Sequence, residues 1–304
     1  MAQTEFDSFL QKEVSKVKGL SYPVRAGFFR RVFIRKVACT KLHPNPNDEF
    51  CFPEIGLNYE IMSRYMKDYR RIMSNDADMQ FMDSAVTEPL EVERIRPHGY
   101  MILNGHHRWG AACRVGVARL PVRIVDLTQE SDLEKMLAGS TSTRRVTLDL
   151  DEVVFRPETD PCLEPRLRFP LNRIYRERLR LGIPALFHML NSNNYDIWIY
   201  TSGYYSMDYL RYYLKHYHVH VAGIVTGLGR KAPSGTDMHK ALEKLMNAKY
   251  KTTIHIDNVA VVRTVSSSMS FDEYPLSGDD EKWSLDVMRI FDEMKKDERA
   301  ETNP

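Results

Sequence analysis

Two aspartates one residue apart follow an apolar run in Val146-Thr-Leu-Asp149-Leu-Asp151-Glu-Val-Val-Phe155. Side chains of a β-strand alternate between the two faces of a sheet, so Asp149 and Asp151 are expected to point the same way from the end of a buried strand. Neighbouring carboxylates repel each other, and such a pair usually binds a cation or keeps one carboxyl protonated. The stretch therefore predicts a functional site.

Apolar strand-like runs alternate with helical stretches through the rest of the second half. This alternation predicts a parallel α/β sheet, whose sites lie beyond the carboxyl ends of its strands. Four further polar residues fall at or just beyond such ends: Thr201, Lys231, Asp257 and Asn258. The expected elements are helix 171–190, strand 195–200, helix 207–216, strand 219–226, helix 236–246, strand 252–257 and helix 283–296.

Length and composition restrict the class of protein. The chain has 304 residues, which favours two domains, and its net charge of +2 is too small to argue for nucleic-acid binding. No apolar run approaches the roughly 20 residues of a membrane span, and the N-terminus lacks the apolar segment of a signal peptide. Four scattered cysteines without CxxC spacing indicate reduced thiols, so we expect a cytoplasmic protein without a membrane partner.

The first half contains a strand–glycine–helix junction at Asn104-Gly105-His106-His107-Arg108. The helix N-terminus leaves backbone N–H groups free to bind an anion, and Arg108 adds a fork suited to phosphate. Alternatively, His106 and His107 only cap the helix, and Arg108 is a solvated surface residue. The surrounding expected elements are helix 2–18, strand 30–37, helix 59–73, strands 90–95 and 100–103, a helix ending near Gly116, and strand 120–126.

Residues from about 31 to 127 resemble the ParB/sulfiredoxin-like family. The resemblance rests on the Pro44-Asn-Pro46 loop, on Pro89-Leu-Glu-Val, and on Asn104-Gly-His-His-Arg108 before an Ala-rich helix and Leu-Pro-Val. It implies nucleotide binding through Gly105, His106, His107 and Arg108.

Two positions refine this expectation. Sulfiredoxins have their reactive cysteine where this chain has His106, so sulfinic-acid reduction is not expected. The Gly-His-His-Arg variant is more similar to small-molecule kinases or nucleoside-triphosphate switches of the family. Glu49 is the nearest match to the acidic residue that assists catalysis in the kinase-like members, with Asp48 and Glu54 also close.

Residues from about 144 to 295 resemble the haloacid dehalogenase (HAD) superfamily, because four motif positions occur in order. The resemblance implies that Asp149 is the nucleophile and Asp151 the general acid and base. It assigns Thr201 to the transferring phosphoryl group and Lys231 to charge neutralisation.

The resemblance also implies a Mg²⁺ site formed by Asp149, Asp151, Asp257 and Asn258. In many members the last motif is Asp-Asp rather than Asp257-Asn258, so this site has one charge fewer. Glu152-Val also replaces the usual Gly-Thr after the second aspartate, and Lys240 is a rival for the role of Lys231.

The segment between Asp151 and the strand around Trp198 is too short for a large cap domain. The site is therefore expected to be open to macromolecular or bulky phosphorylated substrates. Within the segment, Arg173, Arg176, Arg178 and Arg180 are expected on a solvated helix face, with an acidic partner as the alternative. The tyrosines of the helix at 207–216 are expected to serve packing and surface.

We therefore expect an α/β protein of two domains, a small ParB/sulfiredoxin-like α+β domain followed by a Rossmann-like HAD domain with a parallel sheet and a minimal cap. The expected boundaries are a helical extension at 1–30, the nucleotide-binding domain at 31–127, a linker at 128–143, the HAD-like domain at 144–297 and a tail at 298–304.

The expected function is Mg²⁺-dependent hydrolysis of phosphate monoesters through an aspartyl-phosphate, coupled to a domain that binds or turns over ATP, ADP or CTP. The alternative is a regulatory nucleotide- or nucleic-acid-binding protein with a degenerate HAD domain. A phosphorylated substrate and a nucleotide are the expected partners. The near-neutral charge disfavours nucleic acid, and the oligomeric state stays open.

Overall fold

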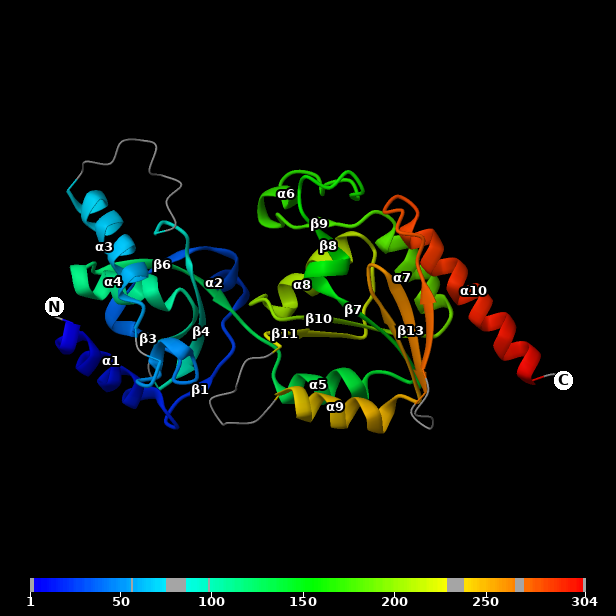
Figure 1. The fold of residues 1–304 in the computed structure, drawn as a ribbon, viewed down its shortest axis with the longest axis horizontal. Helices are drawn as coiled ribbons and strands as arrows, with labels where there is room; N and C mark the ends of the chain where they lie inside the picture. Colours follow the sequence, from blue (N-terminus) through cyan, green and yellow to red (C-terminus); the bar gives the residue numbers. More distant parts are fainter. Residues whose placement is uncertain are drawn as a thin grey trace. The chain divides into compact units, whose positions relative to one another are not determined.

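The computed structural model of the chain describes residues 3–55, 57–74, 86–97, 99–228, 238–265 and 271–302. It is a mixed α/β protein whose internal contacts divide it into two compact units (Figure 1). Residues 1–127 form the body of the first unit, and the second begins at Thr128. Helix α5 (Glu130–Ala138) lies within the expected linker and belongs to the second unit.

The first unit is built on a mixed sheet of order β2-β6-β4-β5-β3, with β1 beside β4. Strands β4 and β5 are antiparallel, whereas β4 and β6 are parallel. The strands are β1 (Tyr22–Pro23), β2 (Arg35–Ala38), β3 (Leu42–His43), β4 (Leu90–Arg96), β5 (Tyr100–Asn104) and β6 (Arg119–Val125). The helices are α1 (Gln3–Val17), α2 (Phe28–Val32), α3 (Tyr59–Met73) and α4 (His106–Val115).

The core of the first unit joins its helices to the sheet. Phe6 of α1, Met62 of α3 and Trp109 of α4 are almost fully buried in one apolar cluster. The expected strand 30–37 is wrong in its first half, where α2 stands, because pairing with β6 extends only from Arg35 to Ala38.

The second unit is built on a sheet of order β11-β10-β7-β12-β13-β14. The first four strands are parallel, as expected, but β13 and β14 add antiparallel pairs that the sequence did not predict. The strands are β7 (Arg144–Asp149), β10 (Asp196–Thr201), β11 (Gly223–Thr226), β12 (Thr252–Ile256), β13 (Ala260–Val265) and β14 (Phe271–Pro275). A separate hairpin pairs β8 (Phe155–Arg156) with β9 (Arg178–Leu179).

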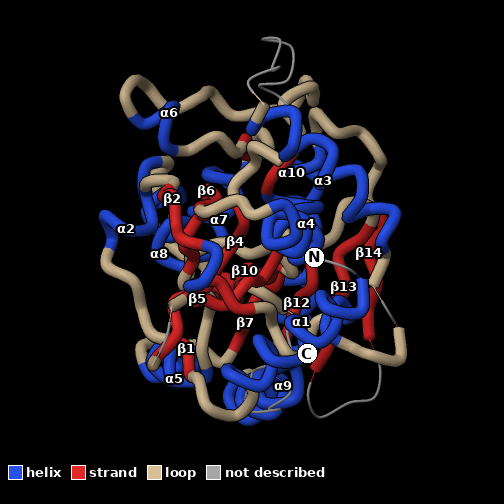
Figure 2. Tube along the Cα trace, turned by 90° about the vertical axis from the view of Figure 1, so that its left-hand side faces the viewer, coloured by secondary structure: helices blue, strands red, loops and turns tan. Residues whose placement is uncertain are grey.

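Helices cover both faces of this sheet. Ile197 and Ile199 of β10 pack in the larger apolar cluster with α7, α8 and α10, whereas Trp198 between them packs with α5 and α9 on the other face. Figure 2 shows α5 and α9 side by side, as Figure 1 does. The remaining helices are α6 (Leu171–Ile174), α7 (Ile183–Ser192), α8 (Met207–His216), α9 (Met238–Lys249) and α10 (Trp283–Thr302).

The single helix expected over 171–190 is wrong. The chain forms α6, then β9, and then starts α7 after Gly182, whose φ of 83° lies in the left-handed region that favours glycine. A Cβ at Gly182 would also lie 2.0 Å from Ser284 Oγ. Helix α10 runs to Thr302, beyond the expected end at residue 296 and into the expected tail. Within the described part of the chain, no helix has the length and apolarity needed to cross a membrane.

Candidate functional site

The carboxyl ends of β7, β10 and β12 bring the predicted acidic residues to one edge of the sheet. Strand β7 lies between β10 and β12, and all three are parallel. Asp149 is the last residue of β7 and is in register with Tyr200, one residue before Thr201 at the end of β10. Asp257 follows directly after β12. The predicted convergence of Asp149, Thr201 and Asp257 at strand ends is present.

A single π-helical turn, Leu150–Val154, follows Asp149 and carries Asp151. Asp149 Oδ1 accepts hydrogen bonds from the backbone N–H groups of Asp151 at 2.8 Å and Glu152 at 2.9 Å. The expectation that Asp149 and Asp151 share a face by strand alternation is therefore wrong, because the strand ends at Asp149. The Asp149 carboxylate instead satisfies the N–H groups that the start of the turn leaves free.

Asp151 reaches the site through Thr201. The buried Thr201 hydroxyl donates a short hydrogen bond to Asp151 Oδ2 and accepts one from the backbone N–H of Gly203 at 2.8 Å. A Cβ at Gly203 would lie 3.0 Å from Thr201 Oγ1 and 2.8 Å from the Tyr205 ring, so the absence of a side chain permits this close turn. The turn after β10 and the turn after β7 are thus joined by one side-chain hydrogen bond.

Asn258 joins the end of β12 to the same turn. Its Nδ2 donates to the backbone oxygen of Glu152 at 3.2 Å, and its backbone N–H donates to Asp257 Oδ1 at 2.6 Å. Its side-chain oxygen, which we expected to face a metal ion, accepts a hydrogen bond from Arg180 Nη1 at 2.6 Å. Asn258 therefore bridges three segments around the site.

Arg180 lies beside this site, although the sequence pattern predicted a solvated position for it. It is 1% exposed, its guanidinium lies 4.0 Å from the centroid of the Trp283 ring, and its Nη2 pairs with Asp280 at 2.5 Å. Burial lowers the pKa of Arg180 from its usual range, with Asp280 acting in the opposite direction. The expected solvated helix face is wrong for Arg180. The alternation Arg178-Leu179-Arg180 next to Gly182 was a strand signal that could have identified it.

The donor set suits a hard cation, although it is sparse. Carboxylate oxygens of Asp149, Asp151 and Asp257 are the ligands that Mg²⁺ prefers, and Mg²⁺ is often held by one or two carboxylates together with water and substrate phosphate. Over the described residues, no group of three or more His, Cys, Asp or Glu side chains is arranged to hold a metal ion. One oxygen each of Asp149 and Asp257 accepts no hydrogen bond from those residues. Lys231 lies outside the described residues.

In the first unit, Gly105 forms the predicted turn between β5 and α4. Its φ of 99° is left-handed, and a Cβ there would lie 2.3 Å from Leu90 Cδ2 and 3.0 Å from Arg108 Nη2. Only glycine fits this position without a shift of its neighbours. The first backbone N–H groups of α4 start immediately after it.

His106 is part of the packing rather than of an open surface. It is 5% exposed, its Nε2 accepts a hydrogen bond from the Asn45 backbone N–H at 3.1 Å, and its Nδ1 lies 3.4 Å from Asp48 Oδ2. Burial lowers the pKa of His106 to about 4, although Asp48 opposes the shift. A neutral His106 therefore fixes the Pro-Asn-Pro loop against the start of α4.

His107 and Glu49 flank this contact. His107 meets the edge of the Phe50 ring at 5.0 Å between centroids, and burial lowers its pKa. Glu49 is exposed on the short turn Glu49–Cys51. Within the described residues, no hydrogen bond or ion pair joins the Glu49 side chain to the Gly105 turn.

Arg108 is 7% exposed, so the alternative of a solvated arginine is wrong. Its Nη1 donates to the backbone oxygen of Glu88 at 2.8 Å and lies 3.6 Å from Glu88 Oε2. The guanidinium thus joins the start of α4 to the residues before β4. Of the four predicted nucleotide-binding residues, His106 and Arg108 are buried at the turn that Gly105 makes.

A comparison with protein families bears on this turn. A model of the ParB N-terminal domain matches residues 73–141, which contain β4, β5, the Gly105 turn, α4, β6 and α5. Among proteins with curated descriptions, none was found to match the chain. Part of the chain, centred on the Gly105 turn, is therefore similar to the ParB N-terminal domain.

Proposed function

We propose that the second unit is a Mg²⁺-dependent phosphohydrolase of the HAD type, which cleaves phosphate monoesters through an aspartyl-phosphate on Asp149. The observation that carries the proposal is the convergence of Asp149, Thr201 and Asp257 at the ends of three adjacent parallel strands, with Asp151 bound to Thr201. The strand order, with β7 between β10 and β12 and the short β8–β9 hairpin following β7 in the chain, supports a Rossmann-like domain with a minimal cap.

The proposed reaction has two steps. The free oxygen of Asp149 attacks phosphorus while the bond from phosphorus to the leaving oxygen breaks, and protonated Asp151 gives its proton to that oxygen. Water then attacks the phosphorus of the aspartyl-phosphate, Asp151 takes a proton from it, and inorganic phosphate leaves the restored Asp149 carboxylate. The Thr201 hydroxyl would turn from Asp151 to a phosphoryl oxygen as substrate enters.

Asp149 and Asp257 would hold Mg²⁺, which cancels charge on the phosphate oxygens when bound, while Asp151 keeps its role as proton donor. Asn258 would join them only if its side-chain oxygen left Arg180. Lys231 is proposed to supply the second positive charge, on the basis of its motif position alone.

For the first unit we propose nucleotide binding at the Gly105 turn, with ATP, ADP or CTP as candidates. The similarity to the ParB N-terminal domain and the free N–H groups at the start of α4 support it. The unit would act either as a phosphotransferase or as a regulatory binding module. A regulatory protein whose second unit binds without turnover is the remaining alternative.

The test is hydrolysis of a generic aryl phosphate by the full chain, with Mg²⁺ and with EDTA. We expect metal-dependent turnover in the wild type and a loss of at least about 10³-fold in Asp149→Asn, because an amide is not a nucleophile here. Asp292→Asn makes the same change on an exposed carboxylate of α10 and should leave turnover intact. Full activity in Asp149→Asn, or none in a folded wild type, would contradict the proposal.

A further inference from the structure

The insertion between β8 and β9 has its acidic and basic residues in separate parts: its first part contains Glu158, Asp160 and Glu164, and its second part is rich in arginine. Residues 166–180 contain six arginines and one acidic residue, Glu177. Arg166 and Arg178 both pair with Glu158 at 2.5 Å. Three other arginines, Arg168, Arg173 and Arg176, are exposed and form no ion pair with any described residue. Residues 165–177, here called the arginine loop, thus present unneutralised guanidinium groups to solvent.

The arginine loop also exposes an aromatic ring. Phe169 is 69% exposed, and the guanidinium of Arg173 lies 5.2 Å from its ring centroid. An exposed ring with a guanidinium over one face gives two planar groups on which a nucleobase can stack. Guanidinium forks match phosphate oxygens, so the combination fits an alternating chain of phosphates and bases.

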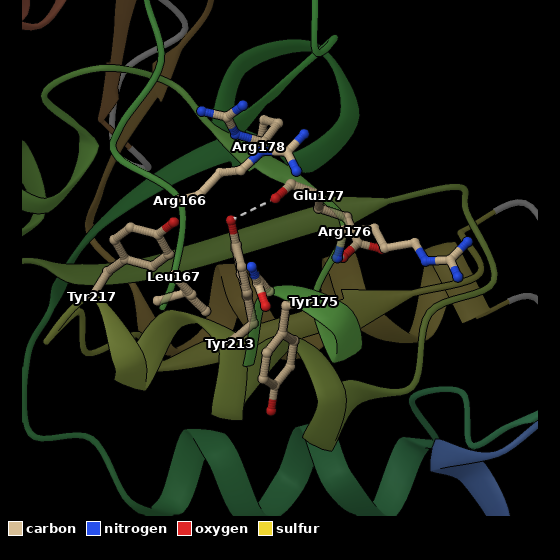
Figure 3. A pocket seen from close by; sticks show the side chains of 9 residues that line it. Arg166, Leu167, Tyr175, Arg176, Glu177, Arg178, Tyr213 and Tyr217 are labelled. Carbon is tan, nitrogen blue, oxygen red and sulfur yellow. Dashed lines mark hydrogen bonds between the residues drawn. The ribbon is translucent and has the colours of Figure 1, made fainter. Parts of the chain in front are cut away.

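Helix α8 holds the backbone of the arginine loop in place. The hydroxyls of Tyr213 and Tyr217 donate hydrogen bonds to the backbone oxygens of Glu177 and Pro165, both at 2.9 Å. The Tyr209 hydroxyl donates to the Glu177 carboxylate at 2.5 Å and lies 3.2 Å from the backbone oxygen of Ile174. Figure 3 shows Tyr213 directed at Glu177, with Arg166 and Arg178 on the same side and Arg176 extending away.

These three tyrosines act as donors throughout the physiological pH range. Burial is the main cause that raises the pKa of Tyr209, Tyr213 and Tyr217 above the usual value, so each hydroxyl keeps its proton. A loop whose backbone is fixed in this way loses less conformational entropy when it binds a ligand. The tyrosines that we expected to serve packing and surface thus position the arginine loop.

The arginine loop is connected through the β8–β9 hairpin to the strand-end site, which consists of Asp149, Asp151, Thr201 and Asp257. Strand β8 begins directly after the π-helical turn that carries Asp151, and the backbone N–H of Arg180 donates to the oxygen of Val154, the last residue of that turn, at 3.0 Å. The hairpin that carries the arginine loop therefore starts at the turn that holds Asp151.

We propose that the arginine loop binds single-stranded nucleic acid and that the substrates of the second unit are strands with a terminal phosphate. This inference rests on the phosphohydrolase proposed above and names its substrate class. The net charge of +2 does not oppose it, because it is a total over the whole chain, whereas residues 165–177 contain four arginines and one acidic residue.

The binding test uses the full chain in EDTA and a fluorescein-labelled single-stranded oligonucleotide, followed by fluorescence anisotropy. The variant Arg168→Gln/Arg173→Gln/Arg176→Gln is expected to bind at least about tenfold more weakly and to reduce the slope of log affinity against log salt by about 2. Phe169→Ala should weaken binding by about tenfold through lost stacking. Melting temperatures establish that each variant is folded.

The matched control, Lys135→Gln/Lys244→Gln/Lys251→Gln, removes the same charge from exposed positions on α5, on α9 and just after α9. It is expected to bind as the wild type does. Absence of binding in the wild type, or equal losses in both triple variants, would overturn the inference. Displacement of the oligonucleotide by polyglutamate of matched charge, together with no effect of Phe169→Ala, would indicate an acidic protein partner and also overturn it.

An assay of oligonucleotide hydrolysis distinguishes failure of this inference from failure of the proposed phosphohydrolase on which it rests. Oligonucleotides with a 5′- or a 3′-phosphate are incubated with Mg²⁺, and kcat/KM is expected to fall at least about tenfold in the arginine variant relative to the lysine control. Turnover of aryl phosphate without oligonucleotide binding would defeat the inference and leave the phosphohydrolase standing. Specific binding with no turnover of either substrate would defeat the phosphohydrolase and the substrate class but retain the binding site.

Discussion

At the scale of single residues, the strand-end site depends on side chains that hold its turns as much as on the carboxylates themselves. Arg180 connects the β8–β9 hairpin, the end of β12 through Asn258, and α10 through Trp283. A guanidinium that is 1% exposed must keep its hydrogen bonds to offset the cost of leaving water. Arg180 therefore holds the Asn258 side chain in place beside the π-helical turn.

We predict that Arg180→Ala lowers the free energy of unfolding of the second unit by about 2–4 kcal/mol, because it removes a buried hydrogen-bonded cation and its stacking on Trp283. Phosphatase activity should fall as well, since Asn258 loses its support. Arg166→Ala, on a side chain that is 55% exposed, should change stability by less than about 0.5 kcal/mol. Urea unfolding followed by circular dichroism compares the two. Equal effects would show that the Arg180 contacts contribute little.

The buried His106 leads to a prediction about how the free energy of unfolding depends on pH. Its pKa is lowered to about 4 in the folded protein, so the unfolded chain binds more protons between about pH 6.5 and pH 4. The stabilisation is therefore fully present above about pH 6.5 and is lost as pH falls toward 4. Over that range, the wild type should lose up to about 3 kcal/mol that His106→Gln does not lose. Thermal unfolding of both proteins between pH 4 and pH 7.5 measures the difference, and parallel pH profiles would exclude this role.

At the scale of elements, the β5–Gly105–α4 junction determines whether the first unit can present its helix N-terminus. Gly105→Ala would place a methyl group 2.3 Å from Leu90 Cδ2 and strain a left-handed φ. We expect a loss of about 2–4 kcal/mol and the loss of nucleotide binding. Gly116→Ala at the other end of α4 has a similar φ of 88° but no atom within 4 Å.

Gly116→Ala should therefore cost only about 1 kcal/mol and leave nucleotide binding intact. Thermal melting and isothermal titration with ATP and with CTP compare the two alanine variants. If both variants lost stability equally, backbone strain alone would account for the effect and the close contact with Leu90 would be unimportant.

Local sequence patterns predicted most elements because hydrophobic periodicity reflects burial. The strand at 195–200 and the helices at 59–73 and 207–216 are present as β10, α3 and α8. The helix expected over 171–190 is not, because Arg178 and Leu179 form a strand by pairing with residues more than twenty positions earlier. Asp149 and Asp151 were placed at the correct strand end, but the turn that brings Asp151 to Thr201 follows from tertiary contacts.

At the scale of the whole molecule, the net charge does not show how charged residues are distributed along the chain. The net charge of +2 suggested little affinity for nucleic acid, whereas the arginine loop contains four arginines and one acidic residue, and three of those arginines are exposed without an ion pair to any described residue. The division into two units similarly separates the Gly105 turn from the strand-end carboxylates. Each proposed site then lies within one unit, so nucleotide turnover can be assigned to one of them by experiment.

We predict that nucleotide turnover and phosphatase activity respond to different variants. Arg108→Ala should abolish nucleotide hydrolysis or binding at the Gly105 turn, because the fork that joins α4 to Glu88 is lost, while aryl phosphate hydrolysis persists. Asp149→Asn should have the opposite effects. Because Arg108 is buried, Arg108→Lys provides a milder variant that keeps the charge but not the fork. Phosphate release from ATP, CTP and an aryl phosphate is measured for all three variants, with melting temperatures to verify folding. Asp149→Asn could abolish hydrolysis of every substrate while nucleotide binding still requires Arg108. In that case the first unit would be a regulatory module. If the Arg108 variants changed neither binding nor turnover, the Gly105 turn would not be a nucleotide site.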